Sequence, residues 1–364
     1  MNRLLFALML ALAMVSCTTT ALQDAGDDNN IITEAKLLTM EQHDGYMVAT
    51  VANPWGDGVM QRYVLVPAAA QLPDSLPEGT IVRTPLSNAL VYSAVHSSLL
   101  TELGAAEAVK GIVDAQYYTD SLVLKKLEAG AIADCGSSMA PTIEKVIEMH
   151  PDGILLSPYQ DSNFEQLERL NSPLIMCADY MEQTPLGRAE WVKFYGALVG
   201  KDAEAEKLFN QVVEDYNRVK AESAQSPRHP KVLTETVISG VWNVPGGKSY
   251  MAQIIKDAGG IYPWTDDDHS GSLSLDFNQV LAVAKDADVW IIKSFGIHSY
   301  DDLKGQYALN DKFDAFSKRK VYVCDTNTTH LYERFPFHPD LLLKDYRDIF
   351  QGNVTEFTFF APCK

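Results

Sequence analysis

The 364-residue sequence has no excess of basic residues, since 30 Lys and Arg stand against 48 Asp and Glu and the net charge is −18. An acidic chain without a basic cluster is not expected to bind nucleic acid. After residue 17, no stretch reaches the roughly 18 apolar residues that a membrane helix needs. No tandem repeat of about 20 to 50 residues is visible either, which excludes a solenoid. A soluble, non-repetitive body is therefore expected.

The sequence also lacks common catalytic signatures, among them G-x-S-x-G, H-E-x-x-H and G-x-x-x-x-G-K-[ST]. Residues 246–249 (GGKS) end like a phosphate loop, but Trp242 stands where that loop requires its first glycine. We therefore expect a binding protein that uses no cofactor. An enzyme acting on a metal chelate is the alternative from a different class.

The N-terminus reads as an export signal. A short positive start is followed by an apolar run from Leu4 to Val15, which is too short to span a membrane. The run ends in MVSC and resembles a bacterial lipobox, which implies that Cys17 is diacylated after cleavage. Residues 18–30 are small, polar and acidic, as expected of a flexible tether.

The mature chain is organised around helices at residues 188–224, interrupted at Gly200, which is a typical helix end. Strand and helix patterns alternate on both sides, which predicts mostly parallel sheets covered by helices. We expect a β-hairpin appendage at 31–85, an α/β lobe at 86–187, the linking helices at 188–224 and a second α/β lobe at 225–364. The predicted fold class is α/β, with two Rossmann-like lobes joined by one long helix.

Four cysteines remain beyond Cys17, and their spacing matches no zinc motif. They allow three disulfide pairings. Only Cys135–Cys177 together with Cys324–Cys363 keeps each bridge within one lobe; free buried thiols are the alternative.

Four segments in order resemble the substrate-binding proteins of ABC importers for iron complexes and vitamin B12. The segments are LVYSAVHSSLLTELGAAEAVKGIV, APTIEKVIEMHPDGILL, GGKSYMAQIIKDAGG and LYERFPFHPDLLLKDYRDIF. The resemblance covers roughly residues 86 to 350. It implies a two-lobed lipoprotein, anchored through Cys17 on the periplasmic side, that captures a metal–organic complex and passes it to a permease dimer with its ATPase.

The ligand is expected where strands end at the interlobe cleft, because loops at the carboxyl ends of parallel strands line such crevices. Aromatic residues that follow predicted strands suit a macrocycle or an aromatic chelate: Tyr117, Tyr118, Tyr159, Trp242 and Phe295. Arg334 matches a position where some family members place a ligand-contacting arginine, and a salt bridge with Glu333 is the alternative role. A ferric siderophore or haem is the expected cargo, and cobalamin is the alternative.

The family docks on its permease through one glutamate on each lobe. Glu144 matches the position on the first lobe. The second position falls on Asn278, which carries no charge, and Asp276 lies two residues earlier as a possible substitute.

A bare zinc or manganese ion is a further alternative cargo, since imidazoles and carboxylates from two lobes could hold one. His96 at the end of a predicted strand could contribute, with His298 or His330 and with Asp325. The eight histidines are scattered and form no His-rich loop, so no metal site is assigned.

Overall fold

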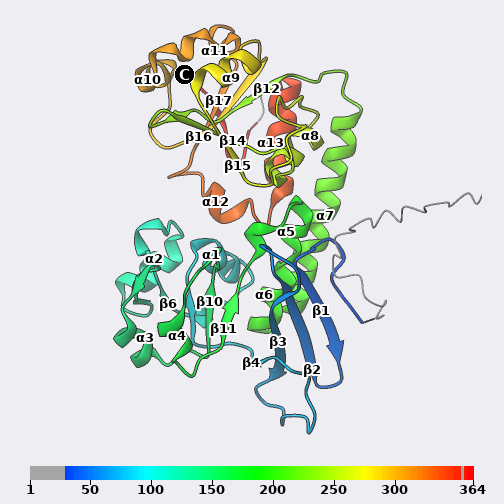
Figure 1. Cartoon of the computed structure of the whole chain (residues 1–364), viewed down its shortest axis with the longest axis vertical. Coiled ribbons are helices and arrows are strands. Elements are labelled where there is room, and N and C mark those ends of the chain that lie inside the picture. Colours follow the sequence, from blue (N-terminus) through cyan, green and yellow to red (C-terminus); the bar gives the residue numbers. More distant parts are fainter. Residues whose placement is uncertain (1–28, 354–355) are drawn as a thin grey trace, which may run out of the picture.

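A computed structural model describes residues 29–353 and 356–364. The predicted signal peptide, Cys17 and most of the predicted tether lie outside these residues. Figure 1 shows two lobes, one above the other, with a long helix running alongside both. The predicted fold class is confirmed. Within the described residues, no helix has the length and apolarity that crossing a bilayer requires.

The N-terminal residues form a four-stranded sheet in the order β1-β2-β3-β4. Its strands are β1 (Leu38–His43), β2 (Tyr46–Ala52), β3 (Val59–Pro67) and β4 (Thr80–Thr84). The predicted hairpin turn lies between β2 and β3, where Gly58 has the positive φ of 91° that favours glycine. The sheet shares its core with the first lobe, since the Tyr63 hydroxyl donates to Leu174 O and accepts from Met176 N.

The first lobe contains a parallel five-stranded sheet in the order β11-β10-β5-β6-β7. Its strands are β5 (Ala89–Val91), β6 (Val109–Ile112), β7 (Ala133–Asp134), β10 (Gly153–Leu156) and β11 (Leu174–Met176). A small hairpin follows β7, formed by β8 (Gly136–Ser137) and β9 (Ala140–Pro141). The helices are α1 (Ala94–Glu102), η1 (Ala106–Ala108), η2 (Ala115–Tyr117), α2 (Ser121–Glu128), α3 (Ile143–Met149), α4 (Glu165–Glu168) and η3 (Asp179–Met181).

Three consecutive helices link the lobes: α5 (Pro185–Glu190), α6 (Val192–Val199) and α7 (Asp202–Ala224). Gly200 ends α6 in the left-handed conformation, as the sequence predicted. At about 1.5 Å per residue, α7 is about 34 Å long. Phe209 lies in the core of the first lobe and Tyr216 in that of the second, so one helix belongs to both cores. This shared burial holds the lobes in a defined relative position.

The second lobe has a sheet in the order β12-β16-β17-β18, in which only β18 is antiparallel. Its strands are β12 (Val232–Thr234), β16 (Val289–Ser294), β17 (Val321–Asp325) and β18 (Ala361–Pro362). A smaller antiparallel sheet consists of β13 (Val237–Ile238), β14 (Val241–Pro245) and β15 (Ser272–Leu275). The helices are α8 (Tyr250–Asp257), α9 (Phe277–Ala284), α10 (Tyr300–Gln306), η4 (Ala308–Lys312), α11 (Asp314–Ser317), α12 (Leu331–Arg334) and α13 (Pro339–Gln351).

All four cysteines of the described chain are buried free thiols, so the alternative without disulfides describes this structure: Cys135, Cys177, Cys324 and Cys363. Burial is the main cause that raises the pKa of the Cys324 and Cys363 thiols to about 11. A raised pKa keeps a thiol protonated and unreactive.

Candidate functional site in the interlobe cleft

The carboxyl ends of the two parallel sheets face each other across the gap between the lobes. Thr119 follows β6 in the first lobe, and its backbone N–H donates to Glu333 Oε1 of the second lobe at 3.1 Å. The Thr119 hydroxyl also donates to the Glu333 carboxylate, which lies 3.2 Å from His330 Nδ1. On the other side of α12, His338 Nε2 lies 2.8 Å from Glu102 Oε1 of α1. These contacts close the cleft at its base.

Large apolar side chains stand exposed on the segments that follow the parallel strands of both lobes. Tyr117 after β6 is 70% exposed, and Phe295 directly after β16 is 72% exposed. The same edges carry four further exposed side chains of this kind: Met139, Tyr159, Ile238 and Tyr332. Met139 lies in the β8–β9 turn, Tyr159 in the loop after β10, Ile238 in β13 and Tyr332 in α12. The large exposed aromatic side chains of the described residues all belong to this set: Tyr117, Tyr159, Phe295 and Tyr332. Their grouping makes the facing edges a candidate binding surface.

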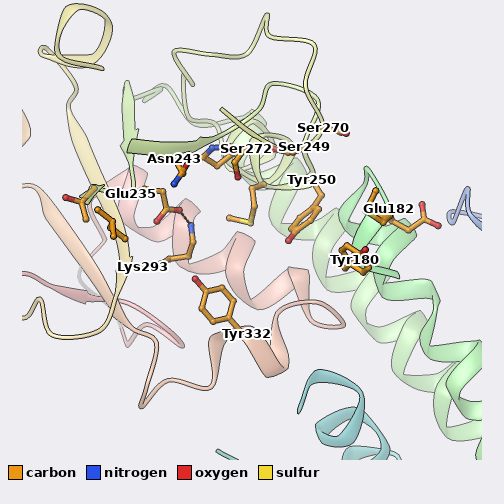
Figure 2. A pocket seen from close by; sticks show the side chains of 16 residues that line it. Tyr180, Glu182, Glu235, Asn243, Ser249, Tyr250, Ser270, Ser272, Lys293 and Tyr332 are labelled. Atoms are coloured by element: carbon orange, nitrogen blue, oxygen red, sulfur yellow. Dashed lines mark hydrogen bonds and ion pairs between the residues drawn. The ribbon is translucent and has the colours of Figure 1, made fainter. Parts of the chain in front are cut away.

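A cavity of about 520 Å³ opens at this cleft, mostly within the second lobe. Its volume lies in the usual range of about 300 to 1,000 Å³ for small-molecule sites. Tyr180 and Met181 of η3 line it on the first lobe, and Asn243 of β14 and Tyr250 of α8 line it on the second (Figure 2). Ile238 and Tyr332 belong both to the exposed apolar set and to the cavity lining. The cavity is therefore continuous with the cleft surface.

A buried ion pair joins Lys293 at the end of β16 to Glu235 just after β12 (Figure 2). The two strands pair in parallel, so their carboxyl ends bring the two side chains together. Burial by itself lowers the pKa of Lys293, but the charge and hydrogen bond of Glu235 together with the Tyr346 and Tyr332 hydroxyls outweigh it, and the net shift is upward. Lys293 therefore stays charged. Glu235 has a φ of 61°, a strained conformation for a non-glycine residue that is often found at functional sites.

A buried polar network supports the cavity wall from behind. Arg188 of α5 donates from Nη1 to the Tyr250 hydroxyl at 3.0 Å and from Nε to Asp179 Oδ2 at 3.2 Å. The other Asp179 oxygen lies 2.8 Å from His96 Nε2 and accepts from the Tyr195 hydroxyl at 2.8 Å. Burial would raise the pKa of Asp179, but His96 and Arg188 outweigh it and lower that pKa to about 2. Through Arg188, this network connects the first lobe and the linker to Tyr250 of the second lobe.

A second hollow of about 330 Å³ lies at the carboxyl edge of the first lobe. The β8–β9 turn contributes Met139 to its lining, the loop after β10 contributes Tyr159, and Phe164 and Tyr92 complete its aromatic part. Both lobes therefore present hollowed aromatic surfaces to the cleft.

The sequence model of the periplasmic binding protein family matches residues 91–328. The chain belongs to this family. It is 30% identical over 227 residues to an uncharacterized lipoprotein of Methanocaldococcus jannaschii, covering 59% of this chain and 54% of that protein. A second uncharacterized lipoprotein of the same organism is 26% identical over 339 residues, covering 88% of this chain and 80% of that protein. The chain thus spans about half the length of the first of these relatives.

Solved structures show the same fold. A periplasmic haem-binding protein from Roseiflexus has a TM-score of 0.58 at 19% identity, covering 74% of this chain and 100% of that chain. A protein of the Fe³⁺-hydroxamate transport system of Saccharomonospora viridis has a TM-score of 0.57 at 18% identity, covering 83% and 98%. A vitamin B12 binding protein from Vibrio cholerae has a TM-score of 0.55 at 11% identity, covering 74% and 99%. The resemblance to a two-lobed binding protein is thereby confirmed.

Two of the aromatic residues predicted at the ligand site belong to the core of this binding protein instead. Trp242 is fully buried, donates from Nε1 to Thr234 O at 2.9 Å and stacks on Trp290 at 5.8 Å between ring centroids. Tyr118 is buried and donates its hydroxyl to Val91 O at 3.0 Å. Neither ring can contact a ligand in this conformation. Tyr117, Tyr159 and Phe295 do lie exposed at the cleft edges.

Arg334 is exposed at the end of α12, close to the interlobe contacts. The suggested salt bridge with Glu333 is wrong, because that carboxylate is bound by Thr119 and His330. Arg334 instead contributes, after His338, to lowering the pKa of Glu102 against the effect of burial. Its guanidinium is available at the rim of the cleft.

The residues considered for a bare metal ion do not come together. His96 is buried in the Asp179 network, and Asp325 Oδ1 accepts from the backbone of Asn327. His330 pairs with Glu333, while His298 is exposed on the loop after β16. Residues 29–353 and 356–364 contain no group of three or more His, Cys, Asp or Glu side chains arranged to hold an ion. The bare-ion alternative therefore has no ligand set in this part of the chain.

The residues considered for permease docking all lie on the outer surface. Glu144 is exposed in the first turn of α3. Asp276 is the N-cap of α9 and accepts from Gln279 N at 2.9 Å, and Asn278 is exposed in the first turn of this helix. The capping bond restrains the Asp276 carboxylate, so it is less free than Glu144 to pair with a partner.

Sequence reasoning missed four residues of the cavity: Glu235, Tyr250, Lys293 and Tyr332. One signal was available for two of them. The apolar strands VLT and VWII are each followed closely by one charged residue, and the two charges have opposite sign. Neighbouring parallel strands place such residues together at one sheet edge.

Proposed function

We propose that this protein is the substrate-binding lipoprotein of an ABC importer. It captures an iron complex, a ferric siderophore or haem, in the interlobe cleft and delivers that complex to a permease dimer with its ATPase. The observation that carries the proposal is the set of six large apolar side chains exposed at the facing carboxyl edges. Flat aromatic faces bind a chelate or macrocycle with large contact area and little loss of side-chain entropy.

The geometry of the linker supports capture with a small movement between the lobes. Because α7 is buried in both cores, a large rotation would break apolar contacts on Phe209 or Tyr216. Small closing movements need only rearrange the contacts of Glu333 and His338 across the cleft. Such a receptor presents nearly the same outer surface with and without ligand.

Lipid anchoring at Cys17 places the receptor outside the cytoplasm, on the periplasmic side of a membrane. The names of the two lipoprotein relatives support this placement. Docking uses Glu144 on the first lobe and Asp276 on the second, with Asn278 beside it. Mass spectrometry of the purified protein tests the anchor: two acyl chains on an N-terminal Cys17 support it, and an unmodified mature terminus contradicts it.

Isothermal titration of the chain beginning at residue 18 tests the cargo. This start keeps Asn30, whose side chain accepts from Met40 N at 3.0 Å. The titrants are a ferric hydroxamate, a ferric catecholate, ferric citrate, haem, cyanocobalamin and zinc. Saturable one-to-one binding of an iron complex, well below micromolar, supports the proposal. Binding of cyanocobalamin alone moves the cargo to cobalamin, and binding of zinc alone or of nothing contradicts the proposal.

A further inference from the structure

The cavity beside the cleft has an unusual chemistry, because a largely buried ion pair forms part of a wall that consists mostly of apolar or uncharged polar residues. The side chains of Lys293 and Glu235 are only 10% and 19% exposed. Burying two charges costs desolvation energy that their attraction often fails to recover, so such a pair is weak evidence for stability. A recognition role accounts better for its position at the mouth of a hollow.

The ion pair can still form hydrogen bonds to a ligand. Among the described residues, the only hydrogen bond of the Lys293 ammonium is to Glu235, and the Glu235 carboxylate accepts only from Lys293. An ammonium has three donors, and a carboxylate has about four lone-pair sites. The pair therefore presents unused donors and unused acceptors within one small region of the wall.

Nearby groups add more donors and acceptors without adding net positive charge. Figure 2 shows the Tyr332 hydroxyl turned toward Lys293, and Asn243 on the opposite wall. The Tyr250 hydroxyl accepts from Arg188, which leaves its own proton to donate into the cavity. Lys293 is the only basic side chain among the described residues that line this cavity, and Glu235 neutralises it. The Glu182 carboxylate is turned away from the cavity (Figure 2) and accepts from Trp191 Nε1.

We propose that this cavity takes an uncharged, hydrogen-bonding arm of the ligand, such as an amide or a hydroxyl group. An anionic arm would approach a cation that Glu235 already neutralises, and no second cation among the described lining residues would balance its charge. A cationic arm would approach Lys293. An amide offers one donor and one acceptor, which the ion pair can satisfy together. The cargo is then a neutral metal complex with a polar periphery, rather than an anionic catecholate or a haem with its two carboxylates.

This inference rests on the proposed function, and a titration separates the two. The probes are two neutral amide-bearing complexes, ferrioxamine E and cyanocobalamin, and two anionic complexes, haem and a ferric catecholate. The full chain with Cys17→Ser as its only substitution is expected to bind at least one neutral complex tenfold or more tightly than either anionic complex. Equal or tighter binding of the anionic complexes overturns the inference but leaves the proposed function standing. No binding of any complex overturns both.

A paired variant locates the effect in the cavity. Lys293→Met with Glu235→Gln removes both charges together and leaves no buried charge without a partner. The matched control is Lys231→Met with Asp286→Asn, which removes an ion pair near the amino ends of the same two strands. The cavity variant should lose tenfold or more in affinity for the neutral complex, and the control should stay within twofold. Unchanged affinity in the cavity variant overturns the inference.

A single substitution keeps the test decisive if the paired variant does not fold. Tyr332→Phe removes the hydroxyl of a half-exposed residue and leaves the ion pair intact. It should weaken binding of the neutral complex severalfold with an unchanged melting temperature. Identical affinity of Tyr332→Phe and wild type, together with equal binding of neutral and anionic complexes, would refute the assignment.

Discussion

Glu333 of the second lobe accepts hydrogen bonds from both the backbone N–H and the hydroxyl of Thr119 of the first lobe. The two residues are 214 positions apart in the chain. Glu333 is buried, and the contact lies at the base of the cleft. This pair restrains the distance between the two carboxyl edges.

Replacing Glu333 with Gln should loosen the cleft. A hydrogen bond to a charged group contributes about 1.5 to 3 kcal/mol, and the neutral amide keeps only part of that. Hydrogen–deuterium exchange should show the Thr119 amide exchanging about tenfold faster in the variant, while exchange in the β1–β2 hairpin stays the same. Unchanged protection at Thr119 would mean that this contact does not hold the lobes.

Asp179 should make the protein sensitive to acid. Its pKa in the folded protein is about 2, below the ordinary value of 3.8, because His96 and Arg188 outweigh the effect of burial. A lowered pKa contributes stability above about pH 4 that is lost as the pH falls toward 2. The shift corresponds to about 2 kcal/mol. Urea unfolding at several pH values should show this loss in wild type and a shallower loss in Asp179→Asn.

At pH 7, Asp179→Asn should lower the free energy of unfolding by about 3 kcal/mol, because it leaves the buried Arg188 without its charged partner. Equal stability of variant and wild type at pH 7 would show that the network is not needed for folding.

Asp340 should act in the opposite direction. Burial raises its pKa to about 6, and its Oδ1 has no hydrogen-bond partner within the described residues. His338 lowers this pKa and Asp215 raises it, both by smaller amounts than burial. Stability should therefore fall as the pH rises from about 4 to about 6. Asp340→Asn should raise the free energy of unfolding at pH 7 by about 1 kcal/mol and change little at pH 3.5. A destabilised variant at pH 7 would contradict this account.

Trp242 and Phe295 were predicted as equivalent ligand contacts, and substitution should separate them. Trp242→Ala should lower the free energy of unfolding by about 3 to 5 kcal/mol, because it leaves a cavity in the second-lobe core. Phe295→Ala removes an exposed ring and should change stability by less than about 0.5 kcal/mol. Chemical denaturation of both variants measures the difference. Similar losses in the two variants would contradict the placement of these rings.

The alternation of strands and helices could be read from the sequence because each element carries its own periodicity and end signals. Gly200 is an example, because α6 ends there in the left-handed backbone conformation that glycine adopts most easily. The orientation of a side chain that follows a strand could not be read in the same way. Tyr117 and Tyr118 are adjacent, yet one is exposed and the other donates to Val91 O in the core. That outcome depends on packing from distant parts of the chain.

Tyr250 was hidden for a related reason. Tyr250 lies in the first turn of a helix whose sequence indicates only an amphipathic pattern. Its place in the cavity depends on Arg188, 62 positions earlier in the chain. Contacts between lobes of this kind leave no local signal.

The aromatic edges of the cleft are proposed to bind a metal complex, and titration of a cleft variant tests this most directly. Tyr117→Ser with Phe295→Ser removes one exposed ring from each lobe, and Ile81→Ser on the N-terminal sheet is the matched control. If wild type binds an iron complex below micromolar, the cleft variant should bind it at least tenfold more weakly, with an unchanged melting temperature and an unaffected control. Affinity that is the same in all three proteins would contradict the account.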